Sequence, residues 1–244
     1  MTDVDDVDVE GGVRAVLSEA VRATDEALRG LDRAERTADA AGREELERVR
    51  SEVRHAARMI LESLLGTVEL ETGREGHGRR VAATARAIAK AMEMPEPDVI
   101  NLDDAARLHD VGELLLDWEQ MSVARDLAPA ERRSLRRHPT IGERLLPTVG
   151  LEPEACRIVG THHERLDGSG YPDRLVGHRV PLGAQVLSVA EAFEAMTHQR
   201  PHRAAQGWEE AVATLRRDAA AGKFNPRVVD ALATLEQERA AIRN

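Results

Sequence analysis

The sequence predicts an all-α protein, and three features of its 244 residues support this class. Aromatic residues make up only 2% of the chain, so Leu, Val, Ile and Ala must build the core. Ala and Arg are abundant while clusters of Gly and Pro are few, which favours helix over strand. The length allows one large domain or two small ones, with a core that needs no disulfide.

The first part of the chain is expected to form a tail and two long helices. Residues 1–11 carry five acidic side chains and little that can be buried, which predicts a disordered acidic tail. Over 13–31 the apolar residues recur at spacings of three and four, and this amphipathic pattern resumes over 46–64. Neither stripe holds His or Asp at ligand spacing. We therefore expect residues 12–70 to be structural, with the stripes buried against each other or in a homodimer.

Residues 71–244 are expected to form a second region, which carries the chemistry. All but one of the nine histidines lie there. No Gly-rich phosphate loop follows a strand-like segment, which disfavours a doubly wound nucleotide-binding fold. Apolar spacing and helix-breaking prolines predict short helices at about 77–92, 98–110, 129–137, 140–147, 152–163, 182–198, 207–221 and 226–243.

Charge and cysteine content narrow the class of protein. The chain has 34 Lys and Arg against 44 Asp and Glu, a formal net charge of −10, which argues against a protein that coats DNA. The single cysteine, Cys156, excludes an intramolecular disulfide and zinc sites built from several thiolates. The acidic N-terminus is unlike a secretory signal, and no apolar run of about 18 residues occurs. We expect a cytoplasmic protein that acts without a membrane.

A group of polar residues marks the candidate site, because its members lie in segments otherwise built from Leu, Val and Ala. These residues are His77, His109, Asp110, His138, His162 and His163. Burying them without partners would be costly, and a shared metal site accounts for them all. Imidazole and carboxylate without thiolate suit iron, manganese, zinc or another borderline divalent ion. Such a site lowers the pKa of bound water to about 7 and neutralises phosphate oxygens, which predicts phosphoester hydrolysis.

The chain contains two conspicuous motifs, HDVG at 109–112 and HHERLDGSGYP at 162–172. The first resembles the HD motif of the HD-GYP family, a branch of the HD phosphohydrolase superfamily, and the second contains the name motif of that family intact. The resemblance runs from about His77 to Val229. It implies an HD-type helical bundle, preceded here by the two long amphipathic helices. It further implies hydrolysis of cyclic di-GMP, a bacterial second messenger, to a linear dinucleotide or to GMP.

The resemblance also implies a set of metal ligands for two or three divalent ions, with iron or manganese favoured and zinc, nickel or magnesium as alternatives. The implied ligands are His77, His109, Asp110, His138, His162, His163 and Glu191. Asp110 is expected to bridge the ions and, with His109, to be catalytic. Glu191 stands where the family usually has Asp. Because Glu keeps the charge and the ligand oxygens, we expect it to coordinate.

Four residues are implied to contact the nucleotide: Gly170, Tyr171, Arg200 and Arg203. An arginine can grip a phosphate or a guanine edge with two donors, and Tyr171 can donate to a phosphate or stack on a base. The alternatives stay open at this point. The two arginines can equally be an ordinary loop pair, and Tyr171 a packed turn residue.

Two departures from the family pattern bear on activity. Glu113 stands where the family has a Lys that contacts phosphate. The carboxylate can face the phosphate pocket or bind another metal, or it can be a solvated glutamate at a helix end. The loop 114–127 keeps its length but lacks the usual Pro and Lys-Pro-Gly turn. A catalytically impaired regulatory protein that binds the nucleotide, and a phosphohydrolase for another nucleotide, therefore remain alternative functions.

Overall fold

The structure, a computed structural model, describes residues 9–116, 128–199 and 204–243. Within these ranges the chain forms ten α-helices and three short 3-10 helices, and the only strand-like feature is an isolated bridge between Asp167 and Val176. The predicted all-α class is confirmed. None of the described helices combines the length and the apolar character needed to cross a membrane.

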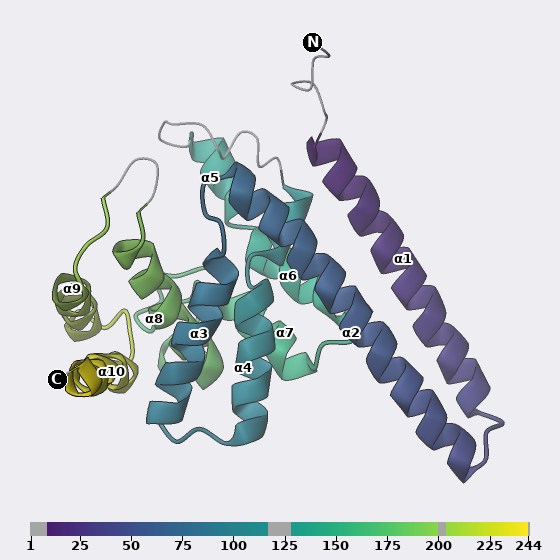
Figure 1. Cartoon of the computed structure of the whole chain (residues 1–244). Coiled ribbons are helices and arrows are strands. Elements are labelled where there is room, and N and C mark those ends of the chain that lie inside the picture. The colour runs from purple at the N-terminus through teal and green to yellow at the C-terminus, as the bar shows by residue number, and fades with distance from the viewer. Residues whose placement is uncertain (1–8, 117–127, 200–203, 244) are drawn as a thin grey trace.

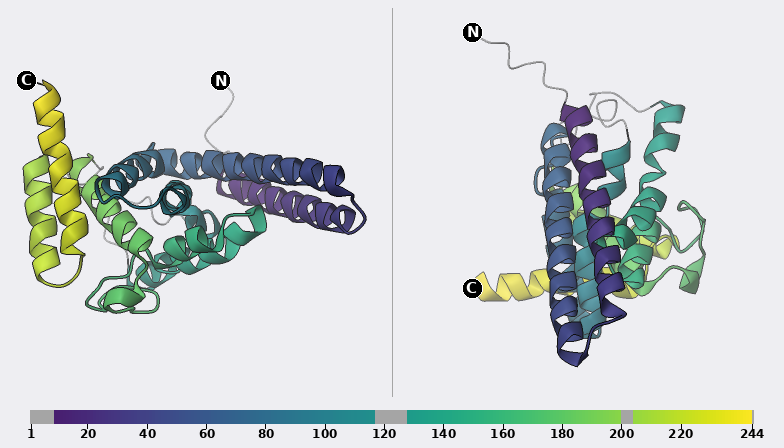
Figure 2. Two further views of the ribbon diagram at one scale, coloured as in Figure 1. Left: turned by 90° about the horizontal axis from the view of Figure 1, so that it is seen from below. Right: turned by 90° about the vertical axis from the view of Figure 1, so that its right-hand side faces the viewer.

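Helices α1 (Val9–Glu35) and α2 (Ala40–Glu71) form a long antiparallel hairpin, which lies along one side of the molecule (Figure 1). The side chain of Asp39 caps α2 by accepting a hydrogen bond from the Gly42 amide (2.8 Å). The turn of the hairpin projects beyond the other helices (Figure 2). Along the hairpin the apolar stripe is only half-buried at Leu28, Leu31, Leu46, Val49 and Val53.

The start of α1 shows that the predicted disordered tail was made too long. Residues 1–11 were expected to be a disordered tail, yet α1 already begins at Val9. The buried Val13 and Leu17 pack this end of α1 against the rest of the protein, which stabilises the turn before them. The rest of that predicted tail, residues 1–8, lies outside the described residues.

The remaining helices form the body, in which α3, α4, α7 and α8 pack around a common centre. Helices α9 and α10 pair on the side opposite the α1–α2 hairpin (Figures 1 and 2). The bounds are α3 His77–Ala91, α4 Glu96–Leu108, η1 Val111–Leu115, α5 Pro129–Leu135, α6 His138–Leu145, η2 Leu146–Val149, α7 Pro153–Thr161, η3 Gly177–Arg179, α8 Leu182–Thr197, α9 Trp208–Ala220 and α10 Pro226–Arg243.

Small and branched aliphatic side chains fill the core, as the composition predicts. Ala82 and Ala85 of α3 and Ala105 of α4 are fully buried, and such small side chains leave room for neighbouring helices to approach closely. The last turns of α2 also belong to this core, through the buried Leu65 and Val68. The core thus continues across the domain boundary that was predicted between residues 70 and 71. The division of the chain into two regions at this point stays a prediction.

Helix ends differ from the prediction where the candidate ligands lie. Apolar spacing predicts helices over 98–110 and 152–163, but α4 ends at Leu108 and α7 at Thr161. The last carbonyl groups of a helix have no partner within the helix, so a side chain just beyond the end can bind them. Both predicted helices end early for this reason, and each is followed by a pair of candidate ligands, His109-Asp110 and His162-His163.

Candidate metal centre

The candidate ligands come from helix ends that meet in the body. His77 and His138 are the first residues of α3 and α6, and His109 and His162 directly follow α4 and α7. All four imidazoles are at most 2% exposed, and Asp110 is 5% exposed. Residues far apart in the sequence are thus brought into one buried group.

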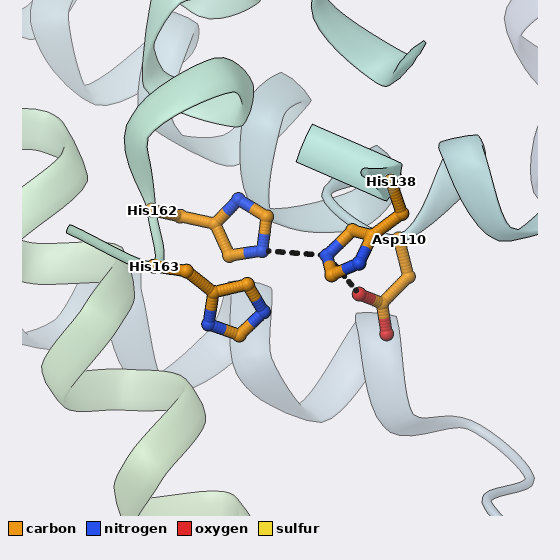
Figure 3. Close-up of side chains that lie close together, drawn as sticks. All are labelled: Asp110, His138, His162 and His163. Carbon is orange, nitrogen blue, oxygen red and sulfur yellow. Dashed lines mark hydrogen bonds and ion pairs between the residues drawn. The ribbon is translucent and has the colours of Figure 1, made fainter. Parts of the chain in front are cut away.

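Asp110 lies between two sets of ligand atoms. Its Oδ1 is 3.4 Å from His138 Nε2, and its Oδ2 is 3.5 Å from His109 Nε2 and 3.8 Å from His77 Nε2. Ligand atoms of Asp110, His138, His162 and His163 all lie within 4.8 Å of one another (Figure 3), as do those of His77, His109 and Asp110. One carboxylate therefore serves two groups, an arrangement that suits two cations with Asp110 between them.

Three of the imidazoles are held in one tautomer by the backbone. His109, His138 and His162 each donate from Nδ1 to the carbonyl oxygen three residues earlier, at 2.9, 2.8 and 2.6 Å. A carbonyl oxygen only accepts, so Nδ1 carries a proton, and Nε2 keeps its lone pair when the ring is neutral. Metal-binding histidines are oriented by such hydrogen bonds on the other ring nitrogen.

The Nε2 lone pairs of two of these rings then face each other with no hydrogen-bond donor between them. The Nε2 atoms of His138 and His162 face each other at 3.3 Å (Figure 3), although neither holds a proton in this tautomer. His109 Nε2 and Glu191 Oε2 are buried, and neither has a hydrogen-bond partner among the described residues. An unsatisfied buried acceptor costs about 1–3 kcal/mol, and a cation at this point satisfies several at once. The residues present therefore fit divalent metal ions.

The protonation states of the site residues also agree with binding of divalent metal ions. Burial holds the pKa values of His162 and His163 well below the usual range of histidine, so both rings are neutral and able to bind a metal ion. Burial also raises the pKa of Asp110, but the neighbouring His109, Arg74 and His138 side chains lower it by more, and the carboxylate stays ionised. Neutral imidazole and ionised carboxylate are the forms that ligate metals.

Glycine at position 112 explains how Asp110 reaches His138. A Cβ on Gly112 would lie only 2.1 Å from the carbonyl oxygen of His138, so any larger residue would push η1 away from α6. The glycine of the HDVG motif thus permits the close approach of the two segments that bear these ligands.

Comparison with known proteins identifies the family. A family model described as HD domain matches residues 63–228. The chain belongs to the HD domain family. The HD-GYP resemblance predicted from the two motifs is likewise confirmed.

Curated relatives of this HD-domain chain are named as phosphodiesterases. A cyclic di-GMP phosphodiesterase of Thermotoga maritima is 36% identical over 185 residues, which cover 73% of this chain and 48% of the relative. The cyclic di-GMP phosphodiesterase response regulator RpfG of Xanthomonas campestris is 34% identical over 197 residues, covering 77% and 51%. The chain thus spans about half the length of these two relatives.

Solved structures share the fold of this HD-domain chain at low sequence identity. An HDG"Y"P protein from Bdellovibrio bacteriovorus matches with a TM-score of 0.59 at 15% identity, over 97% of this chain and 75% of that one. The PgpH HD domain of Listeria monocytogenes matches with a TM-score of 0.52 at 14% identity, over 73% and 98%. Both comparisons support an HD-type helical bundle.

The GYP turn of this HD-domain chain forms one wall of the site. The Tyr171 ring stacks on the His163 ring, with centroids 4.7 Å apart and planes at 27°. The buried Glu164 carboxylate holds the turn by accepting hydrogen bonds from two backbone amides beyond it, at 2.7 and 3.0 Å. Gly170 is buried where a Cβ would lie 2.4 Å from the Arg165 nitrogen. This close approach accounts for the glycine, and its contact with a nucleotide stays a prediction.

Glu191 lies beside the two ligand groups rather than within either. Its Oε2 is 3.8 Å from His163 Nδ1, and it belongs to neither set of mutually close ligand atoms. Burial raises its pKa, but His163 and His109 lower it by more, so the carboxylate is charged. Its role as a metal ligand stays a prediction.

Sequence reasoning missed Glu194, which orients His77. The buried Glu194 carboxylate accepts hydrogen bonds from His77 Nδ1 (2.7 Å) and from Arg80 Nη2 (2.7 Å). Burial raises its pKa, but these partners outweigh burial and lower the pKa to about 2. The ionised carboxylate keeps the proton on His77 Nδ1 and leaves Nε2 directed at Asp110. The available signal was a second acidic residue one helical turn after Glu191.

Replacing Glu194 by Gln is expected to weaken binding of one divalent ion, because the uncharged amide polarises the His77 ring less. Loss of such an outer partner typically costs about 10–100-fold in metal affinity. Titration of the chelator-treated chain with Mn²⁺ measures this change. The control is Glu209→Gln on the exposed face of α9. Equal Mn²⁺ affinity of the Glu194 variant and this control would show that Glu194 does not support the metal centre.

The burial of Glu113 shows that its interpretation as a solvated glutamate is wrong. It is 4% exposed and forms an ion pair with Arg74. The interpretation as a free carboxylate that faces the phosphate pocket does not fit either, because the guanidinium of Arg74 neutralises the Glu113 carboxylate. The sequence could not show this pair, since 39 residues separate its members.

Three other predictions fall partly or wholly on undescribed residues. Arg200 and Arg203, and residues 117–127 of the 114–127 loop, lie outside the described part of the chain. Of the described start of that loop, Leu114 is buried and Leu115 is 45% exposed.

Proposed function

We propose that this HD-domain protein is a metal-dependent phosphodiesterase that hydrolyses cyclic di-GMP to a linear dinucleotide or to GMP. The observation that carries the proposal is the position of Asp110, with one carboxylate oxygen toward each of two buried ligand groups. Divalent ions held there would lower the pKa of water and neutralise the phosphate oxygens of a phosphodiester. The names of the two relatives described above support this substrate.

The donor set supports a choice of metal. Imidazole and carboxylate without thiolate favour iron or manganese, and zinc, nickel and magnesium are to be compared in the same assay. Cys156, the single cysteine of the chain, is buried, and burial raises its pKa to about 11. Its thiol is therefore protonated and is not a metal ligand. A single free cysteine also suits the reducing cytoplasm that we propose as the location of the protein.

The substrate is proposed to reach the site beside His163. The side chain of His163 is 15% exposed, more than the other imidazoles of the two groups. Tyr171 covers the His163 ring, and the Arg136 guanidinium lies 5.2 Å from the centroid of the Tyr171 ring. Burial raises the pKa of Tyr171, so its hydroxyl keeps a proton that it can donate to a phosphate oxygen. Tyr171 and Arg136 thus present donors and positive charge at this edge.

The function is tested by product analysis with a panel of substrates. The full chain is purified without oxygen, loaded with Fe²⁺ or Mn²⁺, and incubated with cyclic di-GMP, 3'3'-cGAMP or cyclic di-AMP. We expect linear dinucleotide or GMP from cyclic di-GMP at the highest kcat/KM of the three. Binding of cyclic di-GMP without turnover under any metal would instead identify a regulatory protein.

A second candidate substrate is 3'3'-cGAMP. One relative, named 3'3'-cGAMP-specific phosphodiesterase 3 and found in Vibrio cholerae, is 34% identical over 140 residues, covering 57% of this chain and 30% of the relative. The departures in the 114–127 loop agree with a changed preference for the base. A higher kcat/KM for 3'3'-cGAMP than for cyclic di-GMP would assign this substrate instead.

We further propose that the N-terminal helices form a homodimer. Val16 of α1 and Met59 of α2 are 50% and 53% exposed, and several apolar residues of the hairpin stripe are only half-buried. A second copy of the hairpin would bury this apolar surface.

The double substitution Val16→Glu and Met59→Glu is expected to give a monomer, because it places charge on the exposed apolar surface without touching the buried core. Light scattering after gel filtration measures the mass of both chains. Replacing exposed polar residues of the same helices, Ser18→Glu and Ser63→Glu, is the control. A full-length chain that stays monomeric at high concentration would contradict the proposed dimer.

A further inference from the structure

The guanidinium of Arg74 connects two carboxylates beside the metal centre. Its Nη1 donates to Asp110 Oδ2 at 3.0 Å, its Nη2 is paired with Glu113, and its Nε donates to Thr72 Oγ1 at 3.2 Å. The Arg74 side chain is 18% exposed, while those of Asp110 and Glu113 are 7% and 6% exposed. Every nitrogen of the planar group is thus fixed by a different acceptor.

The contact of Arg74 falls on the oxygen of Asp110 that faces one ligand group. Oδ2, which accepts from Arg74, is also the oxygen nearest to His109 Nε2 and His77 Nε2, at 3.5 and 3.8 Å. Oδ1 points the other way, toward His138. The hydrogen bond from Arg74 to Oδ2 therefore sets the rotation of the carboxylate.

Among the described residues, the Glu113 side chain is paired with Arg74 and has no hydrogen bond to the side chain of a candidate ligand. It lies in η1, three residues after Asp110, and its backbone amide donates to the Asp110 carbonyl at 2.8 Å. Its side chain reaches back to the same guanidinium that Asp110 binds. The two carboxylates take different nitrogens of the planar guanidinium and together fix its orientation.

We propose that Arg74 is a positioning residue that holds Asp110 Oδ2 toward the His77 and His109 ligand group, and that Glu113 acts through Arg74 by fixing its guanidinium. This inference rests on the proposed metal-dependent function. It assigns the unusual acidic residue at position 113 a role in assembly of the centre rather than in repelling the substrate. The positive charge next to the metals is then supplied from position 74.

The test removes the Arg74–Glu113 pair without leaving the Glu113 carboxylate charged and unpaired. Arg74→Met alone would strand the Glu113 carboxylate and could prevent folding, so the main variant is Arg74→Met combined with Glu113→Gln. Its Mn²⁺ affinity and stoichiometry are measured by calorimetry on the chelator-treated full chain. The thermal midpoint of the same metal-free chain reports folding. The matched control is Arg58→Met with Asp104→Asn, which removes a half-buried ion pair between α2 and α4 (2.7 Å).

We expect the double variant to fold and to bind one Mn²⁺ about 10–100-fold more weakly than the wild type, as is typical for loss of an outer partner. The control pair should leave the Mn²⁺ affinity unchanged. Mn²⁺ binding by the double variant equal to that of the wild type would overturn the inference and leave the proposed function intact. Absence of Mn²⁺ binding by the wild type would instead overturn the proposed function.

A second variant keeps the inference testable if the double variant does not fold. Arg74→Lys retains the charge, but one ammonium group cannot reproduce the planar fork between Asp110 and Glu113. A folded Arg74→Lys chain is expected to bind Mn²⁺ about 10-fold or more weakly. Wild-type affinity in this variant would show that charge alone is needed and would overturn a positioning role.

Discussion

Removal of His109 and Asp110 together, as His109→Ala with Asp110→Ala, is expected to abolish both metal binding and hydrolysis of cyclic di-GMP. Asp110 is the one residue that both ligand groups share, so its loss affects both, while loss of His109 removes a second ligand from one group. We expect a decrease in kcat/KM of at least about 10³-fold, equivalent to about 4 kcal/mol of transition-state stabilisation. Elemental analysis and product quantification measure the two losses separately.

Two comparisons make this result specific. His178→Ala, which changes an exposed histidine outside both ligand groups, should keep the metal content and activity of the wild type. His77→Ala should weaken one ligand group only, because the other group retains Asp110, His138, His162 and His163. Full metal stoichiometry in the His109 and Asp110 double variant would contradict the assignment of the centre.

Replacing Glu113 by Lys is expected to destabilise the protein and lower its activity. A carboxylate that faced the phosphate pocket would predict the opposite outcome, in which a restored cation attracts the phosphate and raises hydrolysis. In the structure the new ammonium group would face the guanidinium of Arg74, which already carries the positive charge. Breaking a buried ion pair in this way costs about 3–5 kcal/mol, which for a chain of this size lowers the thermal midpoint by about 10 °C.

The measurement combines the thermal midpoint of the metal-free chain with kcat/KM for cyclic di-GMP. Glu113→Gln is the matched control, since it removes the charge but keeps an acceptor for Arg74, and a smaller effect is expected. An unchanged midpoint together with faster hydrolysis in the Lys variant would show that residue 113 faces the substrate.

Local sequence patterns predicted much of the fold and of the candidate site. The apolar spacing of the predicted segments 77–92 and 182–198 corresponds closely to α3 and α8, because both helices bury a regular stripe in the body. The motifs HDVG and HHERLDGSGYP identified most of the ligands that the structure brings together. These features depend on residues that lie close together in the sequence, so the sequence alone could show them.

The interactions that orient the ligands could not be predicted in this way. Glu194 and His77 are 117 residues apart, and Arg74 and Glu113 are 39 residues apart. No periodicity connects such residues, since only the packing of α3 against α8 and of η1 near the end of α2 brings them together. The ends of α4 and α7 were also predicted too late, because the apolar pattern continues where the histidines already bind the terminal carbonyl groups.

The central claim is that the two ligand groups around Asp110 form a metal centre that hydrolyses a cyclic dinucleotide. The most direct measurement follows hydrolysis of cyclic di-GMP while Mn²⁺ or Fe²⁺ is added stepwise, without oxygen, to the chelator-treated full chain. We expect no turnover before metal is added and a rise that levels off at about two ions per chain, as in two-metal sites. Turnover by the metal-free chain, or metal bound to both groups without turnover of any cyclic dinucleotide, would contradict the claim.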